Sequence, residues 1–533
     1  MNPPVLSPLS IAVAIGLFST SVWSSNGNVI TVDTLADGSL PDACTLRDAL
    51  RAAATEAAQG GCSAGQPGQN QILIAPSGTL SLSEGALEVT SDVIISGTGI
   101  EALTIDAGGQ SRIFEVDGTG FPGQANDLVL TDMSLRNVGP SLAGGGAIFL
   151  REVDQALIER LAIRDGFRGG IRAQYSGNLR VVDSVISNTT QVGISADLGG
   201  PGGSLELDNV TLADNLSGLW CRCDLELSNS TISGNGGFAN GGGIETYLSN
   251  ASITDTVISG NSTGNVGGAY LNVYDLQMRR VTISGNSGGL AGGLLLRTLG
   301  SAEIEGISVF DNQASGLGGP AGTRGVGGVL INTRPLGELS ISNSTISANT
   351  GSRAGGIDFD DNAAGSTRLD HLTVTDNEGL AAAITGGLSF RVNLADLSIT
   401  NSVIADNRVP QGPADDIVAW TRAEVQDPIV PGADLMLSYS LVEHNSGFNP
   451  QGSGNLLGQA AELGPLADNG GPTLSHAPLP GSPVLNAGDP AFNPPPAFDQ
   501  RGTGFPRVLG GRLDMGAIEA DFDQIFTDRF QLP

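Results

Sequence analysis

The chain has 533 residues, 78 of which are Gly, and its 55 acidic against 25 basic residues give a net charge of -30. Every basic residue other than His is Arg, because the sequence contains no Lys. Phosphate backbones and anionic lipid headgroups would repel such a surface, so we expect neither nucleic acid nor a membrane surface as a partner. The missing Lys also excludes Schiff-base chemistry.

Residues 1–24 have the pattern of a secretory signal peptide. An apolar run from Leu9 to Phe18 is followed by small residues, with a cleavage position near Ser24. The run is too short to cross a bilayer, and no other stretch approaches the length of a membrane span. We therefore expect an exported protein, either secreted or at the cell surface.

Residues 25–70 predict an N-terminal cap. A helix is expected from Thr45 to the glycines at Gly60 and Gly61, because Thr45 and Asp48 form a capping pair and Ala dominates the interior. Cys44 and Cys62 lie on either side of it, and in an oxidising compartment a disulfide between them would contribute about 3 kcal/mol. Such a helix would cover the open end of a stacked β structure.

Residues 71–445 predict a single-stranded, right-handed parallel β-helix, so the fold class is all-β. An apolar, Ser/Thr-rich strand that ends in Asn, such as VTISGN (Val281 to Asn286), recurs about twelve times at intervals of about 20 to 38 residues. Each unit is too short to bury an apolar face alone and must share a core with its neighbours. Hairpin turns are not found at each repeat, which argues against a propeller or sandwich, and the crossover rule gives the handedness.

The terminal Asn of each unit predicts a structural ladder. An Asn side chain in equivalent turns can bond to the next coil and satisfy turn backbone that would otherwise be buried unpaired. The predicted ladder residues are Asn188, Asn215, Asn235, Asn261, Asn286, Asn312, Asn349, Asn377 and Asn407.

A second recurring piece is a Gly-Gly pair followed by alternating residues. Strand alternation places the first residue after the glycines inward; these residues are Ile171, Ile244, Ala269, Leu294, Val329, Ile357 and Leu388. The residues expected to face outward are Arg172, Trp220, Arg222, Glu245, Tyr247, Tyr270, Asn272, Tyr274, Arg297, Asn332, Asp358, Asp360, Ser389 and Arg391. Two interpretations remain open for this outward row: an ordinary solvated sheet face, or a surface that binds a polysaccharide or cell-surface glycan. The glycan candidates are Trp220, Arg222, Tyr247, Tyr270, Asn272, Tyr274, Arg297 and Arg391.

The segment IDFDDN carries the strongest acidic cluster. Asp358, Asp360 and Asp361 could ligate Ca²⁺ through oxygen or serve as acid and base in glycoside hydrolysis. Ion binding or plain solvation is the preferred interpretation, so no cofactor other than calcium is expected. Cys221 and Cys223 are both expected to face inward as packed core thiols, too awkwardly placed for a mutual bridge.

Both ends of the chain resemble known modules. VITVDT, CTLRDAL at Cys44 and QILIAPSGTLSL resemble the bacterial CSLREA family, with Thr45 and Asp48 in place of the family's Ser and Glu. LGPLADNGGPTLSHAPLPGSPVLNAGD from Leu463, DQRG at Asp499 and DMGAIE at Asp514 resemble the choice-of-anchor Q module, which implies a closing module at 446–520. The tail at 521–533 contains IFTDRFQ, which is similar to an IFxDGFE-type tail of exported bacterial proteins, although Arg529 and Gln531 break that pattern.

The coils between these modules resemble the pectate-lyase-like β-helix superfamily. Polygalacturonases of this fold use neighbouring Asp pairs, but they also need a Gly-His-Gly turn and a basic strand that this sequence lacks. The lyase motif is also missing, and His371, His444 and His476 do not have the required setting. The expected function is therefore a non-catalytic, monomeric surface or secreted protein for adhesion or glycan binding, with a polysaccharide lyase or hydrolase and a structural spacer as alternatives.

Overall fold

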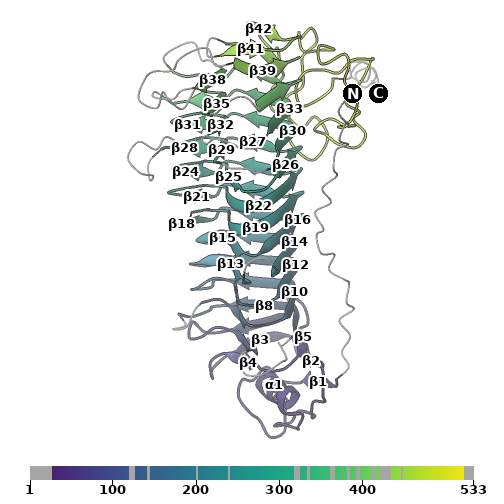
Figure 1. Ribbon diagram of the computed structural model, residues 1–533. Coiled ribbons are helices and arrows are strands. Elements are labelled where there is room, and N and C mark those ends of the chain that lie inside the picture. The colour runs from purple at the N-terminus through teal and green to yellow at the C-terminus, as the bar shows by residue number, and fades with distance from the viewer. Residues whose placement is uncertain are drawn as a thin grey trace, which may run out of the picture.

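The computed structural model describes residues 27–118, 127–140, 145–199, 202–237, 240–316, 325–332, 337–359, 366–380, 385–391, 397–410, 416–420, 434–445 and 448–520. The predicted signal peptide at 1–24 and the tail at 521–533 lie outside these residues. The described strands stack as a parallel β-solenoid, drawn upright in Figure 1, with a 36-stranded sheet wound around it and a second, six-stranded sheet.

Each coil contributes a strand to three faces. The first face carries the strands that follow the Gly-Gly pairs. It consists of β4 (Leu87–Val89), β7 (Phe114–Asp117), β9 (Ile148–Arg151), β11 (Ile171–Gln174), β13 (Val192–Asp197), β15 (Ser217–Arg222), the first halves of β19 (Ile244–Thr254) and β22 (Ala269–Arg279), β25 (Leu294–Thr298), β29 (Val329–Ile331), β32 (Ile357–Phe359), β35 (Leu388–Arg391) and β38 (Ile417–Trp420).

The second face begins with β1, which pairs in parallel with β2 from Val29 opposite Gln71. The stack therefore starts inside the segment predicted as a cap. This face consists of β1 (Val29–Val32), β2 (Asn70–Ile74), β5 (Val93–Ser96), the first halves of β8 (Leu128–Arg136), β10 (Gln155–Arg164), β12 (Asn178–Ser187) and β14 (Ser204–Ala213), β16 (Asp224–Ser228), the second halves of β19 and β22, β26 (Ala302–Glu305), the first halves of β30 (Leu339–Ser347) and β33 (Thr367–Thr375), β36 (Leu397–Thr400), β39 (Asp434–Ser438) and β41 (Asn449–Gln451).

The third face ends each coil just before the recurring Asn. It consists of β3 (Gly78–Ser81), β6 (Leu103–Asp106), the second halves of β8, β10, β12, β14, β30 and β33, and β17 (Thr231–Ser233), β20 (Val257–Ser259), β23 (Thr282–Ser284), β27 (Ser308–Phe310), β37 (Val403–Ala405), β40 (Leu441–Val442) and β42 (Leu456–Leu457). The six-stranded sheet follows the Asn and consists of β18 (Gly236–Gly237), β21 (Ser262–Thr263), β24 (Ser287–Gly288), β28 (Gln313–Ala314), β31 (Thr350–Gly351) and β34 (Glu378–Gly379). Strands β41 and β42 pair with β39 and β40, so the stack continues beyond residue 445.

The helix α1 (Leu46–Thr55) packs against β1, β2 and β4 at one end of the stack (Figure 1). Thr45 accepts a hydrogen bond from the backbone N–H of Asp48, as the capping pair predicts. The helix ends earlier than expected, because Glu56, which precedes Gly60, already adopts a left-handed conformation that terminates it. The Cys44–Cys62 disulfide is present, and it ties the start of the helix to the loop after it.

The Asn ladder is present from Asn215 onward. Asn261 is typical: its backbone N–H and its Nδ2 both donate to Oδ1 of Asn286, at 2.9 and 3.0 Å, and Nδ2 also donates to the Ile232 carbonyl. The same pattern joins Asn215, Asn235, Asn261, Asn286, Asn312, Asn349, Asn377 and Asn407. Because every amide hydrogen and oxygen has a partner, burial of these side chains leaves no unsatisfied polar group.

Asn188 is not a ladder residue, contrary to the sequence prediction. It lies at the corner with φ of 55°, it is exposed, and Thr189 takes the ladder position by donating from N and Oγ1 to Oδ1 of Asn215. In later coils the corner is filled by the residue before the Asn, such as Gly260 or Gly285 with φ near 60°. The Asn in SNTT therefore occurs one residue too early to enter the ladder.

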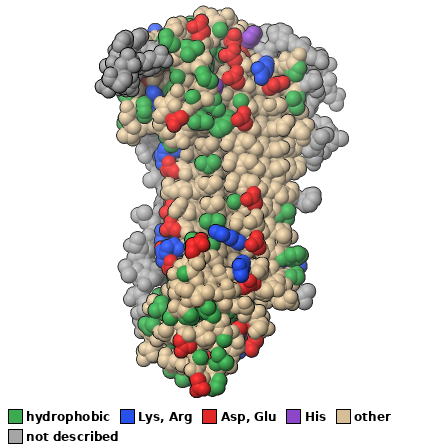
Figure 2. All heavy atoms as spheres, turned by 180° about the vertical axis from the view of Figure 1, so that it is seen from behind, with side chains coloured by type: hydrophobic (Ala, Val, Ile, Leu, Met, Phe, Trp, Pro, Cys, Tyr) green, Lys and Arg blue, Asp and Glu red, His purple; other side chains and the backbone are tan. Residues whose placement is uncertain are grey.

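Most Arg side chains described on the surface join neighbouring coils. Arg160 pairs with Asp132 at 2.7 Å, and Arg280 pairs with Asp255 at 2.6 Å. Figure 2 shows this arrangement on one face, where acidic side chains outnumber basic ones and several Arg lie beside an acidic group. Such exposed pairs stabilise a fold only slightly, but they neutralise many of the few positive charges that this chain carries.

Apart from β41 and β42, which continue the stack, the segment at 448–520 lies along the third face of the last coils, so the predicted closing module contacts the side of the stack. Thr345 donates to Gln500 at 2.6 Å, His476 bonds with Ser347 at 2.8 Å, and the Ala517 N–H donates to Thr373. A small apolar core fills this contact and consists of Val403, Ala405, Leu441, Ala461, Val484 and Met515. Outward Ser and Thr side chains are therefore buried here.

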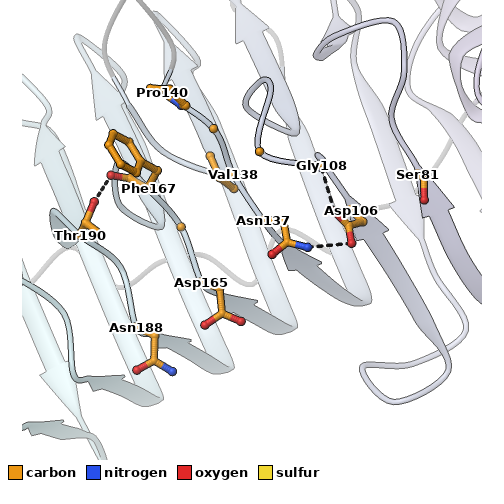
Figure 3. A pocket seen from close by; sticks show the side chains of 13 residues that line it. Ser81, Asp106, Gly108, Asn137, Val138, Pro140, Asp165, Phe167, Asn188 and Thr190 are labelled. Atoms are coloured by element: carbon orange, nitrogen blue, oxygen red, sulfur yellow. Dashed lines mark hydrogen bonds between the residues drawn. The ribbon is translucent and has the colours of Figure 1, made fainter.

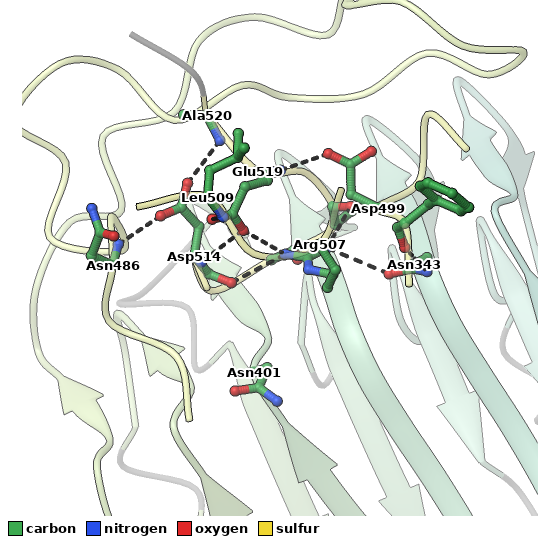
Figure 4. Close-up of polar contacts among 12 residues, drawn as sticks. Asn343, Asn401, Asn486, Asp499, Arg507, Leu509, Asp514, Glu519 and Ala520 are labelled. Atoms are coloured by element: carbon green, nitrogen blue, oxygen red, sulfur yellow. Dashed lines mark hydrogen bonds and ion pairs between the residues drawn. The ribbon is translucent and has the colours of Figure 1, made fainter. Parts of the chain in front are cut away.

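Arg507 holds this lateral module together (Figure 4). Its side chain is fully buried and donates to the carbonyl oxygens of Asp514, Gly516 and Ala517, and its Nη2 lies 3.7 Å from Glu519. Burial raises the pKa of Glu519 to about 7, and the neighbouring charge of Asp514 adds to this effect. A single buried cation therefore organises several backbone and acidic groups of the module.

Candidate functional site

The first face positions the candidate residues. Its register runs from Ile244 through Ala269, Leu294, Val329 and Ile357 to Leu388, one residue per coil. All of these side chains, together with Ile171, are buried in the main core. The inward positions are therefore confirmed.

The outward positions are only partly exposed, which differs from the simple alternation. Glu245, Tyr270, Asp358 and Ser389 are all buried. From Gly241 to Thr385, the residues before the Gly-Gly pairs form a column of parallel bridges, and members such as Val266 pack over outward side chains of the first face. A second apolar cluster results, which consists of Val266, Tyr270, Ala291, Leu295, Val326, Leu330 and Ala354.

Three aromatic rings form a continuous strip at the edge of this cluster, in which Trp220 and Tyr247 are half-buried and Tyr270 is buried. The rings of Trp220 and Tyr247 have centroids 5.9 Å apart, and those of Tyr247 and Tyr270 have centroids 6.1 Å apart. The strands that carry them, β15, β19 and β22, are consecutive on the first face. Arg297, on the next strand, donates from Nη1 to the Tyr270 hydroxyl at 2.7 Å. We call Trp220, Tyr247, Tyr270 and Arg297 the aromatic strip.

A buried carboxylate fixes the middle of the aromatic strip. Glu245 accepts a hydrogen bond from the Tyr247 hydroxyl, and it also accepts hydrogen bonds from the backbone N–H and Nδ2 of Asn240. Burial and the bond to Glu245 raise the pKa of Tyr247 to about 12, so this phenol stays neutral. The ring is therefore held in one orientation by the buried Glu245 carboxylate and the Asn240 amide.

The remaining glycan candidates lie around the strip. Asn272 is half-buried in the row next to Tyr247, and Arg222 is exposed and pairs with Asp197 at 2.6 Å. Tyr274 is exposed at the bend after the first face, and no ring contact of Tyr274 is found among the described residues. The backbone of Arg391 lies on β35, but its side chain is outside the described part.

Asp358, the described member of the predicted acidic cluster, is not at the surface as the sequence suggested. Asp358 is fully buried and forms an ion pair with Arg353 at 3.0 Å. It occupies the covered first outward position of β32, opposite Leu330 and Ser389. Asp360 and Asp361 lie outside the described residues.

Cys221 and Cys223 are bonded to each other, which corrects the prediction of two separate thiols. Alternation places both side chains on the same side of the chain, and their Cα atoms are 5.5 Å apart, within the range that disulfides use. The bond closes directly after Trp220 and buries both sulfurs in the core.

An earlier aromatic position on the same face was missed by the sequence analysis. Phe149 on β9 is flanked by the guanidinium groups of Arg112 at 4.5 Å and Arg151 at 5.2 Å from the ring centre. The coil reads GGGAIFLR, and Ala147 separates the glycines from the strand, so the Gly-Gly spacing did not align it. The register of β9 with β11, which places Ile148 opposite Ile171, reveals the equivalence.

A groove of 710 Å³ lies at the corners of the early coils (Figure 3). Its polar lining comes from the exposed corner residues Asn137, Asp165 and Asn188 and from the half-buried Asp106 at the end of β6, and Phe167 and Val138 form its apolar part. Asn137 donates to Asp106 at 2.9 Å, and Thr190 contacts the Phe167 carbonyl. The groove arises because these coils carry their Asn or Asp at the corner, outside the buried ladder.

Comparisons with known proteins agree with the solenoid. The family model described as "Right handed beta helix region" matches residues 218–404. No curated protein matches the chain. Within the described residues, no helix is long and apolar enough to cross a membrane.

Two solved structures are similar to the chain. One is the tailspike protein 3 of bacteriophage CBA120, with a TM-score of 0.41 and 11% identity over 68% of this chain and 58% of that chain. The chain thus spans less than two thirds of the tailspike. The other is pectate lyase Pel9A, with a TM-score of 0.26 and 14% identity over 93% of this chain and 97% of that chain.

Proposed function

We propose that this chain is an exported, non-catalytic β-helix protein that binds a glycan along the aromatic strip of its first face. The observation that carries the proposal is the contact of Trp220, Tyr247 and Tyr270 on consecutive coils. Sugar rings present apolar C–H faces that pack on aromatic rings, while their hydroxyls need fixed polar partners. The aromatic strip presents aromatic rings and fixed polar groups in a row that runs along the axis of the stack.

Rigidity supports this proposal. Tyr247 is held by Glu245 and Asn240, and Tyr270 is held by Arg297. Side chains that are ordered before binding lose little conformational entropy when a ligand arrives. Polar groups for sugar hydroxyls are available nearby on Asn272 and on the Arg222–Asp197 pair.

The proposal also includes the parts of the chain around the coils. We propose that α1 and its disulfide form a CSLREA-like cap and that the segment at 446–520 is a choice-of-anchor Q-like module. We also propose that residues 1–24 direct export and that the exported protein is a monomer. The two disulfides support an oxidising compartment.

The alternative activities have less support. A lyase or hydrolase would use Asp358, Asp360 and Asp361 as acid, base or calcium ligands, yet Asp358 is buried and paired with Arg353. A substrate would have to break the ion pair between Asp358 and Arg353 and displace the residues that cover Asp358. A structural spacer requires no aromatic strip and predicts no glycan binding.

A glycan array with the purified full chain tests the proposal, followed by titration of any hit with Trp220→Ala and Tyr247→Ala. We expect each variant to weaken binding by about twofold to tenfold, since one ring contact contributes about 0.5 to 1.5 kcal/mol. Tyr175→Asn is the matched control, because Tyr175 is an exposed ring at a corner with φ of 54°, which Asn tolerates. Binding that is equally strong in all three variants, or no binding to any glycan, contradicts the proposal.

A further inference from the structure

The Asn ladder does not end on another Asn. Strand β37 pairs with β40 so that Val403 faces Leu441 and Ile404 faces Val442, and continuation of this register puts Asn445 opposite Asn407. Asn407 nevertheless donates from N and Nδ2 to Oδ1 of Asp416, at 3.3 and 2.8 Å. A carboxylate from the start of β38 therefore replaces the expected amide at the last step.

The second oxygen of Asp416 faces the end of the next coil. Oδ2 accepts the backbone N–H of His444 at 2.8 Å and lies 3.6 Å from the imidazole Nδ1 of the same residue. Glu443 is the third member of the group, and one ligand atom from each of Asp416, Glu443 and His444 lies within 4.8 Å of the other two. Asp416 is fully buried, whereas the His444 side chain is 46% exposed, which leaves a path from solvent.

This group carries more negative than positive charge. The only ion pair of Asp416 within the described residues is with His444, and no Arg pairs with Asp416 or Glu443 there. The backbone N–H of Asp406 donates to the Glu443 carboxylate at 2.9 Å. A buried carboxylate needs a nearby cation or a proton, and a divalent ion would neutralise this group more completely than one imidazole.

We propose that Asp416, Glu443 and His444 bind one divalent transition-metal ion, with Zn²⁺ the best fit, at the C-terminal end of the Asn ladder. One imidazole nitrogen and two carboxylate oxygens are ligands that Zn²⁺ accepts at about 2.0 to 2.2 Å, with water in the fourth position. Such bonds separate tetrahedral ligands by about 3.4 Å, close to the 3.6 Å between Asp416 and His444. Rotation of the partly exposed Glu443 completes the set.

The ion would fasten the last coil to the ladder. Asp416 lies at the start of a first-face strand, whereas Glu443 and His444 follow β40 on the third face. A single metal would therefore join two strands of different faces, in addition to the hydrogen bond between Asp416 and His444. If Asp416 served only as the last acceptor of the Asn ladder, the carboxylate alone would be enough. Neither the His444 imidazole nor Glu443 would be needed beside it.

Zn²⁺ titration of the full, metal-free chain by calorimetry tests the proposal, with Co²⁺ absorption as a second readout of coordination geometry. We expect one site per chain, a thermal midpoint that rises with Zn²⁺ by mass action, and visible Co²⁺ bands of a low-coordinate site. His444→Ala and Glu443→Gln should each weaken Zn²⁺ binding by about tenfold or more. Glu303→Gln, which removes an exposed carboxylate paired with Arg279, is the matched control and should change nothing.

Asp416→Asn is a separate variant, because it also disturbs the bond to the His444 N–H and can lower stability without any metal. The proposal therefore rests on the His444 and Glu443 variants, which leave the ladder bonds intact. Equal Zn²⁺ binding by the parent chain and His444→Ala would overturn it. The proposal would also be overturned if the parent chain bound no Zn²⁺, or if Ca²⁺ or Mg²⁺ at equal concentration displaced the bound Zn²⁺.

Discussion

Arg297 donates a hydrogen bond to the hydroxyl of Tyr270 on the preceding coil, and its guanidinium carbon lies 5.5 Å from the centre of the same ring. One side chain thus fixes both the position and the polar end of the last ring in the aromatic strip. Tyr270 is itself buried to 7% exposure by the residues that fold over the first face.

Replacement of Arg297 by Leu should weaken glycan binding more than it lowers stability. The ring of Tyr270 would lose its hydrogen bond and its cation contact, which contributes about 0.5 to 1 kcal/mol at a partly exposed site. We expect a several-fold loss of affinity in titration and little change in the thermal midpoint. Arg279→Leu, which removes an exposed pair with Glu303, is the control and should bind as the parent does.

Replacement of Asn286 by Ala should destabilise the middle of the stack by about 2 to 4 kcal/mol. Its amide satisfies the Ile258 carbonyl and accepts from both the N–H and Nδ2 of Asn261, and each buried group left unpaired costs about 1 to 3 kcal/mol. Denaturant unfolding measures the change. Asn265→Ala should cost far less, because within the described part of the chain the Asn265 side chain makes only a 3.4 Å contact with Asn240. Equal losses in the two variants would contradict the ladder's role.

Replacement of Arg507 by Ala should release the lateral module. The change leaves Glu519 and three carbonyl oxygens without their buried donor, and loss of one partner of a buried pair costs about 3 to 5 kcal/mol. We expect rapid cleavage within 448–520 by limited proteolysis while the coils before Gly306 stay protected. Arg512→Ala is the control, since Arg512 donates only to loop carbonyls within the module. Uniform loss of protection along the chain would argue against a local role.

Acidification should weaken the module through His371. This imidazole is buried beside the ring of Phe492, and neither nitrogen has a hydrogen-bond partner among the described residues. Burial, and then the charge of Arg507, lowers its pKa well below 6.5. The folded form therefore keeps His371 neutral, and its contribution to stability is present above pH 6.5 and is lost as pH falls toward the folded pKa.

Unfolding free energy measured from pH 7.5 to 5 tests this expectation. The His371 contribution should fall by up to about 1.4 kcal/mol per pH unit below pH 6.5. In His371→Asn, whose side chain does not titrate and tolerates the φ of 55°, that part of the slope should disappear. A slope that is the same in both chains would mean that His371 is not responsible.

The repeated phrase and the period-two pattern were enough to predict the solenoid and its inward column, because both follow from local geometry. The sequence also placed Cys44 and Cys62 together around a helix. The exposure of the outward column could not be predicted, since it depends on Val266 and its equivalents folding over the neighbouring strands. Alternation tells which side of a sheet a residue occupies, but not what covers that side.

The same limit applies to the two ends of the ladder and to the C-terminal segment. Asn188 and Asn215 look alike in sequence, yet a shift of one residue separates an exposed corner from the buried column. Nothing in the local pattern indicated that Asn407 would bond to Asp416, or that Thr345 and Gln500, 155 residues apart, would meet. These contacts depend on loops whose paths no repeat specifies.

The lateral position of the C-terminal module has a mechanical consequence. Its hydrogen bonds reach Gly306, Asn343, Thr373 and Asn401, which belong to successive coils. A bare stack of repeats can fray from its end one rung at a time, because each rung contacts only its neighbours. Here the C-terminal module connects several of the last coils from outside, so unfolding from that end must first detach the whole module. Mechanical pulling on the chain should therefore unfold several coils in a single step.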